Sequence, residues 1–173
     1  MNKWYMLVVV GKDRPGIVAK VTSALFDGGC NLGEASMALL GGNFSIMLMV
    51  QHEGSARTLE DMLETVVDSL GLHLHIDQID GGLHRYVEPD VRITIFGADR
   101  AGIVAHATGA LAEAGLNILN LESDVAGTEE KPIYILHIEG QATEGIESLH
   151  SALDIISKEG VETSLLEMDT VIG

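Results

Sequence analysis

A twelve-residue run that could bind a small charged molecule occurs twice in this chain. It reads GKDRPGIVAKVT at residues 11–22 and GADRAGIVAHAT at residues 97–108, and eight of the twelve positions are identical. In each copy an apolar stretch ends at a glycine, an Asp-Arg pair follows, and helical spacing begins near Gly16 or Gly102. The first N–H groups of a helix have no partner within the helix, and they attract anions. Amide donors beside a carboxylate would suit an α-amino acid, which carries both charges.

Each polar or glycine residue of the run also has an ordinary structural use. Asp13 and Asp99 could accept hydrogen bonds from the first helical N–H groups, as N-cap residues do, or could hold an ammonium group. Gly16 and Gly102 remove a side chain where a ligand or another backbone segment could approach. The run by itself therefore leaves a structural role and a binding role open.

The other reactive residue types form no recognisable catalytic set. His73 and His75 share a face of a predicted strand, which is a spacing that metal ligands also use, but no third His or Cys lies near them in the sequence. The chain contains no G-x-S-x-G elbow, no Walker A sequence and no G-x-G-x-x-G fingerprint. We therefore expect no enzyme activity, no metal site and no cofactor.

The two copies of the run belong to a longer repeat. A shift of 86 residues places Gly11 on Gly97 and Asn31 on Asn117. Further on, FSIMLMVQ (44–51) aligns with PIYILHIE (132–139) at a shift of 88, which predicts two extra residues in the preceding loop of the second repeat. A glycine pair and a proline lie between the repeats and are typical of a connection. We predict two domains, at 1–82 and 91–173, joined by a linker at 83–90.

Each repeat has the same predicted order of elements, β-α-β-β-α-β. In the first repeat, buried-strand and alternating patterns mark the strands, and apolar residues at helical spacing mark the helices. The predicted strands are 3–10, 30–40, 44–50 and 72–79, and the predicted helices are 16–28 and 59–70. This order is that of an α+β fold of the ferredoxin-like type, an antiparallel sheet with both helices on one face. Two such units in tandem are expected.

The other face of the sheet is also predicted to be apolar. Met37, Leu39, Met47 and Met49 lie in the two strands that form the predicted hairpin, and they indicate apolar side chains on both faces. A large apolar surface is usually covered in the working protein. Pairing of two units or of two chains, and hence a homo-oligomer, is therefore expected.

Charge and composition narrow the classes of partner. The chain has 26 acidic and 10 basic residues and a net charge of −16. Nucleic acids and anionic membranes are bound through clusters of Lys and Arg, which this sequence lacks, so neither is an expected partner. Cys30 is the single cysteine, so no internal disulfide can form, and no signal-peptide pattern is evident at the start. A cytoplasmic protein is expected.

The first repeat carries the residues of a known family. The segment GKDRPGIVAKVTSALFDGGCNLGEASMALLGGNFSIMLMV (11–50) resembles an ACT domain, a small ligand-binding module of amino-acid metabolism. In detail it is similar to the glycine cleavage system transcriptional repressor family, whose members are tandems of two ACT units. The second repeat keeps D-R-x-G-I-V and Asn117, but Ala101 replaces the proline of the first repeat.

The resemblance implies paired units with an effector bound at their interface, against the first strand–helix turn and the start of the second strand. Carried over by position, the implied ligand-binding residues are Asp13, Gly16, Ile17 and Asn31 in the first unit and Asp99, Gly102, Ile103 and Asn117 in the second. The implied effector is a small amino acid, with glycine or serine favoured. The implied partner is a regulatory protein such as a DNA-binding activator. An alternative implied by the same family is a stand-alone regulatory subunit that controls a metabolic enzyme in trans.

Overall fold

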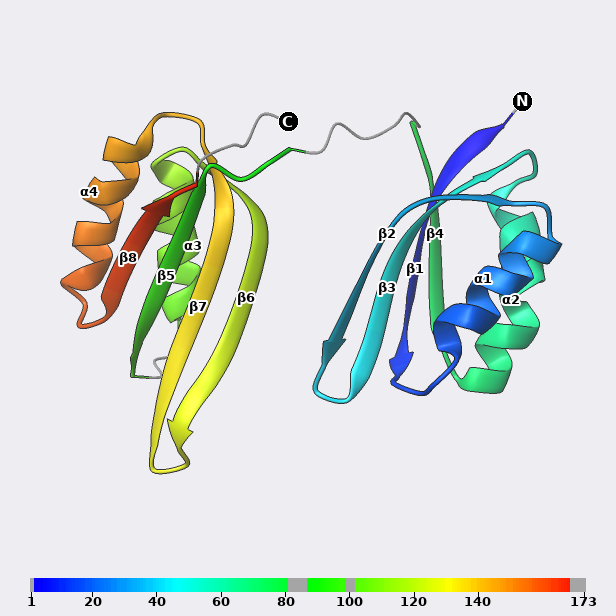
Figure 1. The fold of residues 1–173 in the computed structure, drawn as a ribbon, viewed down its shortest axis with the longest axis horizontal. Coiled ribbons are helices and arrows are strands. Elements are labelled where there is room, and N and C mark those ends of the chain that lie inside the picture. The colour runs from blue at the N-terminus through cyan, green and yellow to red at the C-terminus, as the bar shows by residue number, and fades with distance from the viewer. Residues whose placement is uncertain (1, 81–86, 99–101, 169–173) are drawn as a thin grey trace. The chain divides into compact units, whose positions relative to one another are not determined.

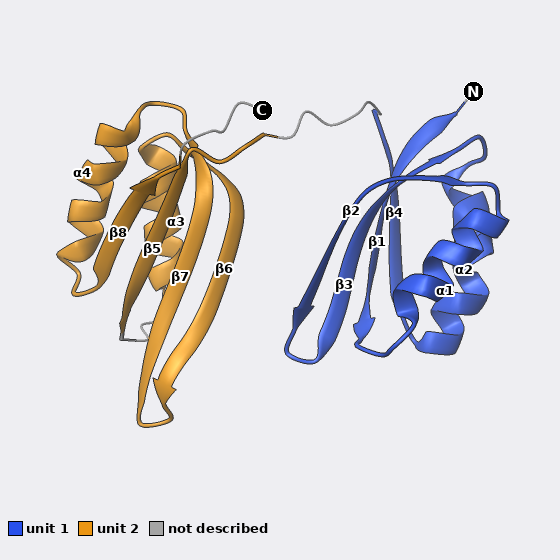
Figure 2. Cartoon of the chain, viewed as in Figure 1, with its two compact units in different colours: residues 1–84 blue, residues 85–173 orange. Residues whose placement is uncertain are grey.

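The computed structural model describes residues 2–80, 87–98 and 102–168. The chain divides into two compact units, Met1–His84 and Arg85–Gly173 (Figure 2). The predicted linker at 83–90 lies partly outside the described residues. Among the helices that are described, none is long and apolar enough to cross a membrane.

Unit 1 is a four-stranded antiparallel sheet with two helices on one face (Figure 1). The strand order is β2-β3-β1-β4, so β2 and β4 are the edges and β1 and β3 form the centre. The elements are β1 (Lys3–Lys12), α1 (Ile17–Asp27), β2 (Asn31–Leu40), β3 (Asn43–His52), α2 (Ala56–Leu70) and β4 (His73–Ile79). The predicted βαββαβ order is confirmed.

Unit 2 repeats this topology with the strand order β6-β7-β5-β8. Its helices likewise cover one face of its own sheet (Figure 1). The elements are β5 (Val91–Ala98), α3 (Ile103–Glu113), β6 (Leu116–Thr128), β7 (Lys131–Ala142), α4 (Ile146–Ser157) and β8 (Glu162–Glu167).

Each unit has a core of its own between sheet and helices. In unit 1, Tyr5, Leu7 and Val9 alternate along β1 and are almost fully buried, as are Leu59 and Leu63 of α2. Alternation along a strand places such residues on one face, here the face that the helices cover. In unit 2 an equivalent cluster forms from the corresponding strands and helices, and the two clusters share no residue. Burial of each large aliphatic side chain stabilises a unit by about 1.5–3 kcal/mol.

The hairpin of unit 2 is longer than its sequence alignment predicts. Asn31 pairs with Gln51 across β2 and β3, and their separation is 20 residues. The equivalent pair in unit 2, Asn117 and Gln141, is separated by 24 residues. The insertion is therefore four residues and not the predicted two. The extra residues lengthen both strands of the unit 2 hairpin, β6 and β7. The sequence alignment placed its gap only in the loop and therefore counted two residues too few.

Candidate functional site

The first strand–helix turn of unit 1 depends on Gly16. β1 ends at Lys12 and α1 begins at Ile17, and Gly16 is the N-cap with φ at +89°. A side chain disfavours this left-handed conformation, whereas glycine adopts it freely. A Cβ built at Gly16 would meet no atom within 4 Å, so the backbone conformation and not crowding requires a glycine here. The space beside the helix start is consequently open.

The first glycine of the repeated run has a different role. A Cβ at Gly11 would lie 2.6 Å from Cδ2 of Leu72, just before β4, and a Cβ at Gly97 would lie 3.0 Å from Cγ1 of Val161. Both glycines therefore let the central strand pass close to the chain as it enters the last strand of its unit. The repetition of this residue is explained by packing.

Asp13 does not cap α1, and the prediction of a capping role for it is wrong. No side chain accepts a hydrogen bond at the start of this helix, because Gly16 occupies the N-cap position. The backbone N–H of Asp13 donates to the carbonyl of Gly42 at 3.1 Å, which ties the turn to the β2–β3 hairpin. Within the described part of the chain, neither the Asp13 carboxylate nor the Arg14 guanidinium has a hydrogen-bond or ion-pair partner. Both charges remain available at the turn.

A cavity of about 510 Å³ adjoins this turn. Its size falls within the range of roughly 300–1,000 Å³ that is usual for small-molecule sites. The residues that line it are Asp13, Arg14, Gly16, Ile17, Val18, Ala19, Met37 and Phe44. Three of the four predicted site residues of unit 1 are therefore brought together. Ile17 is only 2% exposed and belongs mainly to the core, so its backbone is the part best placed to meet a ligand.

The lining of this cavity combines three kinds of chemistry. The N–H groups of Ile17, Val18 and Ala19 are in the first helical turn, where no intrahelical acceptor exists, and Arg14 adds a positive charge. These donors suit a carboxylate, and the Asp13 carboxylate suits an ammonium group. Met37 of β2 and Phe44 of β3 supply an apolar wall.

The fourth predicted residue, Asn31, lies at the other end of unit 1. It pairs with Gln51, which in turn pairs with Trp4 near the start of β1. Lys12, beside the turn, pairs with Asn43 instead. Eight residues of strand at about 3.3 Å each separate these two ends by about 26 Å. One unit therefore cannot bring Asn31 and the turn to the same small ligand.

In unit 2 the same geometry is only partly described. Gly102 is the N-cap of α3 with φ at +88°, and Ile103 follows as the first helical residue. Asn117 pairs with Gln141 at the end of the sheet away from this turn, as Asn31 does in unit 1. Asp99 and Ala101 lie outside the described residues.

Sequence reasoning missed several residues of the cavity. The signal for Arg14 was present in the sequence, because it lies within the repeated run and recurs as Arg100 in the second copy. Met37 and Phe44 reach the turn only through strand pairing, since Phe44 pairs with Gly11 on one side and with Leu39 on the other. The strand register, which the structure supplies, is needed to place them.

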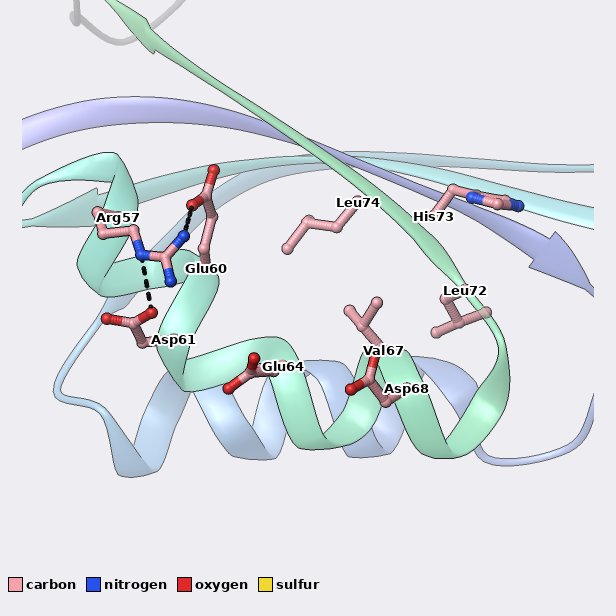
Figure 3. Close-up of a pocket in the computed structure, with 9 residues that line it drawn as sticks. All are labelled: Arg57, Glu60, Asp61, Glu64, Val67, Asp68, Leu72, His73 and Leu74. Atoms are coloured by element: carbon pink, nitrogen blue, oxygen red, sulfur yellow. Dashed lines mark hydrogen bonds and ion pairs between the residues drawn. The ribbon is translucent and has the colours of Figure 1, made fainter.

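A second cavity, of about 300 Å³, lies between α2 and β4 (Figure 3). Carboxylates of α2 line it together with an apolar floor, and Arg57 is held by Glu60 at 3.3 Å and by Asp61 at 3.1 Å. The Arg57 guanidinium in this cavity is therefore already paired with carboxylates, unlike the Arg14 guanidinium at the turn. Across the described residues, no group of three or more His, Cys, Asp or Glu side chains could hold a metal ion.

Comparison with known proteins identifies the class of this fold. The family profile of the ACT domain matches residues 5–77, and a second ACT profile matches residues 91–156. The chain belongs to the ACT domain family and carries two ACT domains in tandem. It is a regulatory ACT-domain protein, which confirms the resemblance seen in the sequence.

Individual relatives cover one or both units. The glycine cleavage system transcriptional repressor of Escherichia coli (strain K12) is 25% identical over 137 residues, which are 79% of this chain and 72% of that protein. The UPF0237 protein YjhC of Lactococcus lactis subsp. lactis (strain IL1403) is 31% identical over 83 residues, which are 46% of this chain and 95% of that protein. A crystal structure of an unknown protein from Galdieria sulphuraria has a TM-score of 0.80 at 24% identity, and covers 98% of this chain and 100% of that chain.

Proposed function

We propose that this protein is a non-catalytic regulator that binds a small amino acid at the β1–α1 turn of unit 1 and acts through a partner protein. The observation that carries the proposal is the cavity at this turn. It places unpaired amide donors and Arg14 beside the Asp13 carboxylate, so both charged groups of an α-amino acid find a counterpart. Glycine and serine are the favoured effectors. The cavity volume of about 510 Å³ and the apolar wall of Met37 and Phe44 also suit amino acids with larger side chains.

Asn31 contributes to effector binding only if it reaches the turn of a second ACT unit. Its amide can donate to a carboxylate and accept from an ammonium group, which is the chemistry that an effector site needs. Because it lies about 26 Å from the turn of its own unit, we propose that it serves the turn of a neighbouring unit in a second copy of the chain. Asn117 would act in the same way in unit 2, with Asp99, Gly102 and Ile103.

The proposed partner is a DNA-binding regulator of glycine cleavage genes. The relation to the Escherichia coli repressor supports this direction. The net charge of −16 disfavours direct contact with DNA and favours a partner with a basic surface. A pull-down that recovers a metabolic enzyme in place of a transcription factor would favour the alternative, a regulatory subunit that acts in trans.

Calorimetry with the twenty amino acids tests the binding function. We expect one small amino acid to bind, and we expect Asp13→Ala and Arg14→Ala each to weaken binding about 10- to 100-fold, since each removes a charge-assisted hydrogen bond. Lys12→Ala is the matched control, because Lys12 is an exposed charge next to the turn that does not line the cavity. No binding at millimolar concentrations, or equal loss in all three variants, would contradict the proposed site.

A further inference from the structure

A row of carboxylates follows the cavity between α2 and β4 (Figure 3). Glu60, Glu64 and Asp68 recur at every fourth position of α2, and all three line this cavity. Residues four apart lie on one face of a helix, about 6 Å apart along its axis. Asp61 lies beside this row and lines the cavity as well. Together these exposed side chains give the cavity a negative edge.

The negative charge of this row is only partly balanced. Among the described lining residues, Arg57 is the only Lys or Arg, and Glu60 and Asp61 share its guanidinium. Within the described part of the chain, the carboxylates of Glu64 and Asp68 have no ion-pair partner. Like charges four residues apart destabilise a helix. A cation placed along the row would relieve this repulsion.

The floor of the cavity is apolar. Val67 of α2 and Leu74 of β4 are half-buried, and both pack against the core of unit 1 while they line the cavity. Figure 3 shows them in the space between helix and strand, with Leu72 where the chain enters β4. The cavity thus combines exposed carboxylates with apolar side chains that a partner can cover. We refer to it, with its carboxylate row and its apolar floor, as the acidic groove.

Unit 2 has a different charge pattern on the matching helix, α4. Counted from the N-cap residue of each helix, the places of Glu60, Glu64 and Asp68 are taken in unit 2 by His150, Asp154 and Lys158. One carboxylate and one ammonium group remain, so the three positions carry little net charge at neutral pH. The fold that both units share therefore does not require a row of carboxylates.

The apolar floor also differs between the units. Leu74 and Thr163 each pair with the matching residue of the central strand of their unit. Thr163 is hydrogen-bonded to Ser157 of α4 at 2.8 Å. Ser157 lies as far past the N-cap of α4 as Val67 lies past that of α2. A pair of hydroxyl groups in unit 2 thus takes the place of two apolar side chains in unit 1.

We propose that the acidic groove binds a basic amphipathic helix of the partner protein. This inference rests on the proposed function, in which the protein acts through a partner, and it adds the surface and the chemistry of that contact. Lys or Arg side chains of the helix would meet the carboxylate row, and its apolar side chains would cover Val67 and Leu74. The spacing matches, since side chains four apart on the partner helix also repeat about every 6 Å.

The charge of the chain argues against a second copy as the occupant. The chain has 26 acidic and 10 basic residues, so a second copy would bring further negative charge to the groove. The row from Glu60 to Asp68 spans about 12 Å, or about two helical turns. A contact of this length is small, as in transient regulatory encounters. We therefore expect a weak, salt-sensitive complex with a basic segment of another protein.

A synthetic peptide is the probe for the acidic groove. It has about 18 residues, consists of Leu and Lys at amphipathic helical spacing, and carries a fluorescent label for anisotropy titrations with the full chain. We expect saturable binding at about 150 mM salt. The triple change Glu60→Gln, Glu64→Gln and Asp68→Asn should raise the dissociation constant at least about 10-fold, because it removes the charges that face the Lys side chains.

Two further variants separate the groove from the general acidity of the chain. The matched control, Glu113→Gln, Glu122→Gln and Asp154→Asn, neutralises three exposed carboxylates of unit 2. It changes the net charge by the same amount and should alter the dissociation constant less than about 2-fold. The double change Val67→Ser and Leu74→Thr gives the groove a hydroxyl pair without a change of charge, and should weaken binding about 3- to 10-fold. Circular dichroism verifies that all variants fold.

Three results would overturn the proposal. These are no saturable binding of the peptide, equal weakening by both triple changes, and a groove variant that binds like the wild type. The second result would show that the peptide binds the acidic surface in general. The acidic groove and the cavity at the turn share no lining residue, so calorimetry with the twenty amino acids should give the same result for the groove variant as for the wild type. A peptide that fails to bind while an amino acid still binds rejects the groove alone.

Discussion

The central cross-strand pairs of the two sheets have the same register but opposite chemistry. Met6–Met49 and Val8–Met47 in unit 1 occupy the positions of Arg92–Glu139 and Thr94–His137 in unit 2. The residues that shape the backbone, Gly11 and Gly16 with their equivalents in unit 2, are retained. The two units therefore share a fold, whereas the exposed faces of their sheets differ in chemistry at these two pairs.

The largest expected effect comes from a cavity in one of the two cores. Leu63→Ala should lower the free energy of unfolding of unit 1 by about 3 kcal/mol, because Leu63 is fully buried. Leu153→Ala should do the same in unit 2, where this residue is 4% exposed. Hydrogen exchange followed by mass spectrometry resolves the two units. Because the cores share no residue, faster exchange in both units after either change would contradict their independence.

A smaller effect is expected at the turn that the two units share. Gly16→Ala should destabilise unit 1 by about 1–2 kcal/mol, since φ of +89° is unfavourable for a residue with a side chain. Gly102→Ala should cost unit 2 a similar amount, because its φ is +88° and a Cβ there would meet only Nε2 of His106, at an ordinary contact distance of 4.0 Å. Urea unfolding of each variant measures the two costs. A clear inequality would show that one turn is under a constraint that the other lacks.

The contrast between the two sheets can be tested by giving unit 2 the apolar cross-strand pair of unit 1. The double change Arg92→Met and Glu139→Met gives unit 2 the pair found in unit 1. Its stability should change by less than about 1 kcal/mol, because the ion pair that is lost is partly exposed. The variant should associate more strongly than the wild type in sedimentation experiments, since an apolar pair then replaces an ion pair on the exposed face of the unit 2 sheet. An unchanged association state would show that this pair does not control contact between copies.

The smallest effect concerns Cys30, whose position is occupied by Leu116 in unit 2. Burial raises the pKa of the Cys30 thiol above its ordinary value of 9.0. In the unfolded chain the thiol therefore loses its proton at lower pH, so the free energy of unfolding should fall slightly as the pH rises above about 9. Below that range Cys30 should contribute no pH dependence. The difference in free energy of unfolding between the wild type and Cys30→Ala should be constant below about pH 9 and should change only above it. A difference that already varies with pH around pH 6 would contradict this account.

The sequence was sufficient to predict the order of elements and much of the cavity. Helical spacing and alternation predicted all six elements of unit 1, and the repeated run drew attention to Asp13, Gly16 and Ile17. Those residues are contiguous or nearly so, and a local pattern can therefore find them. The reason for Gly16 is a positive φ, which the sequence alone could not separate from a need for close approach.

Features that depend on strand pairing were beyond the sequence. Met37 and Phe44 join the cavity, and Asn31 stays away from it, because of the register of β2 and β3. The same cause explains the insertion of four residues where the alignment predicted two. The contrast between the exposed sheet faces of the two units also depends on which residues pair across the central strands.

The central claim is that the turn of unit 1 binds an amino acid, and an NMR titration tests it most directly. The ¹⁵N-labelled chain would be titrated with each of the twenty amino acids, and the backbone amide shifts would be followed. We predict shifts that saturate at residues 16–19 and beside Met37 and Phe44, and that require about 10- to 100-fold more ligand in the Arg14→Ala variant. Saturating shifts confined to other parts of the chain, or no saturating shift with any amino acid, would contradict the account.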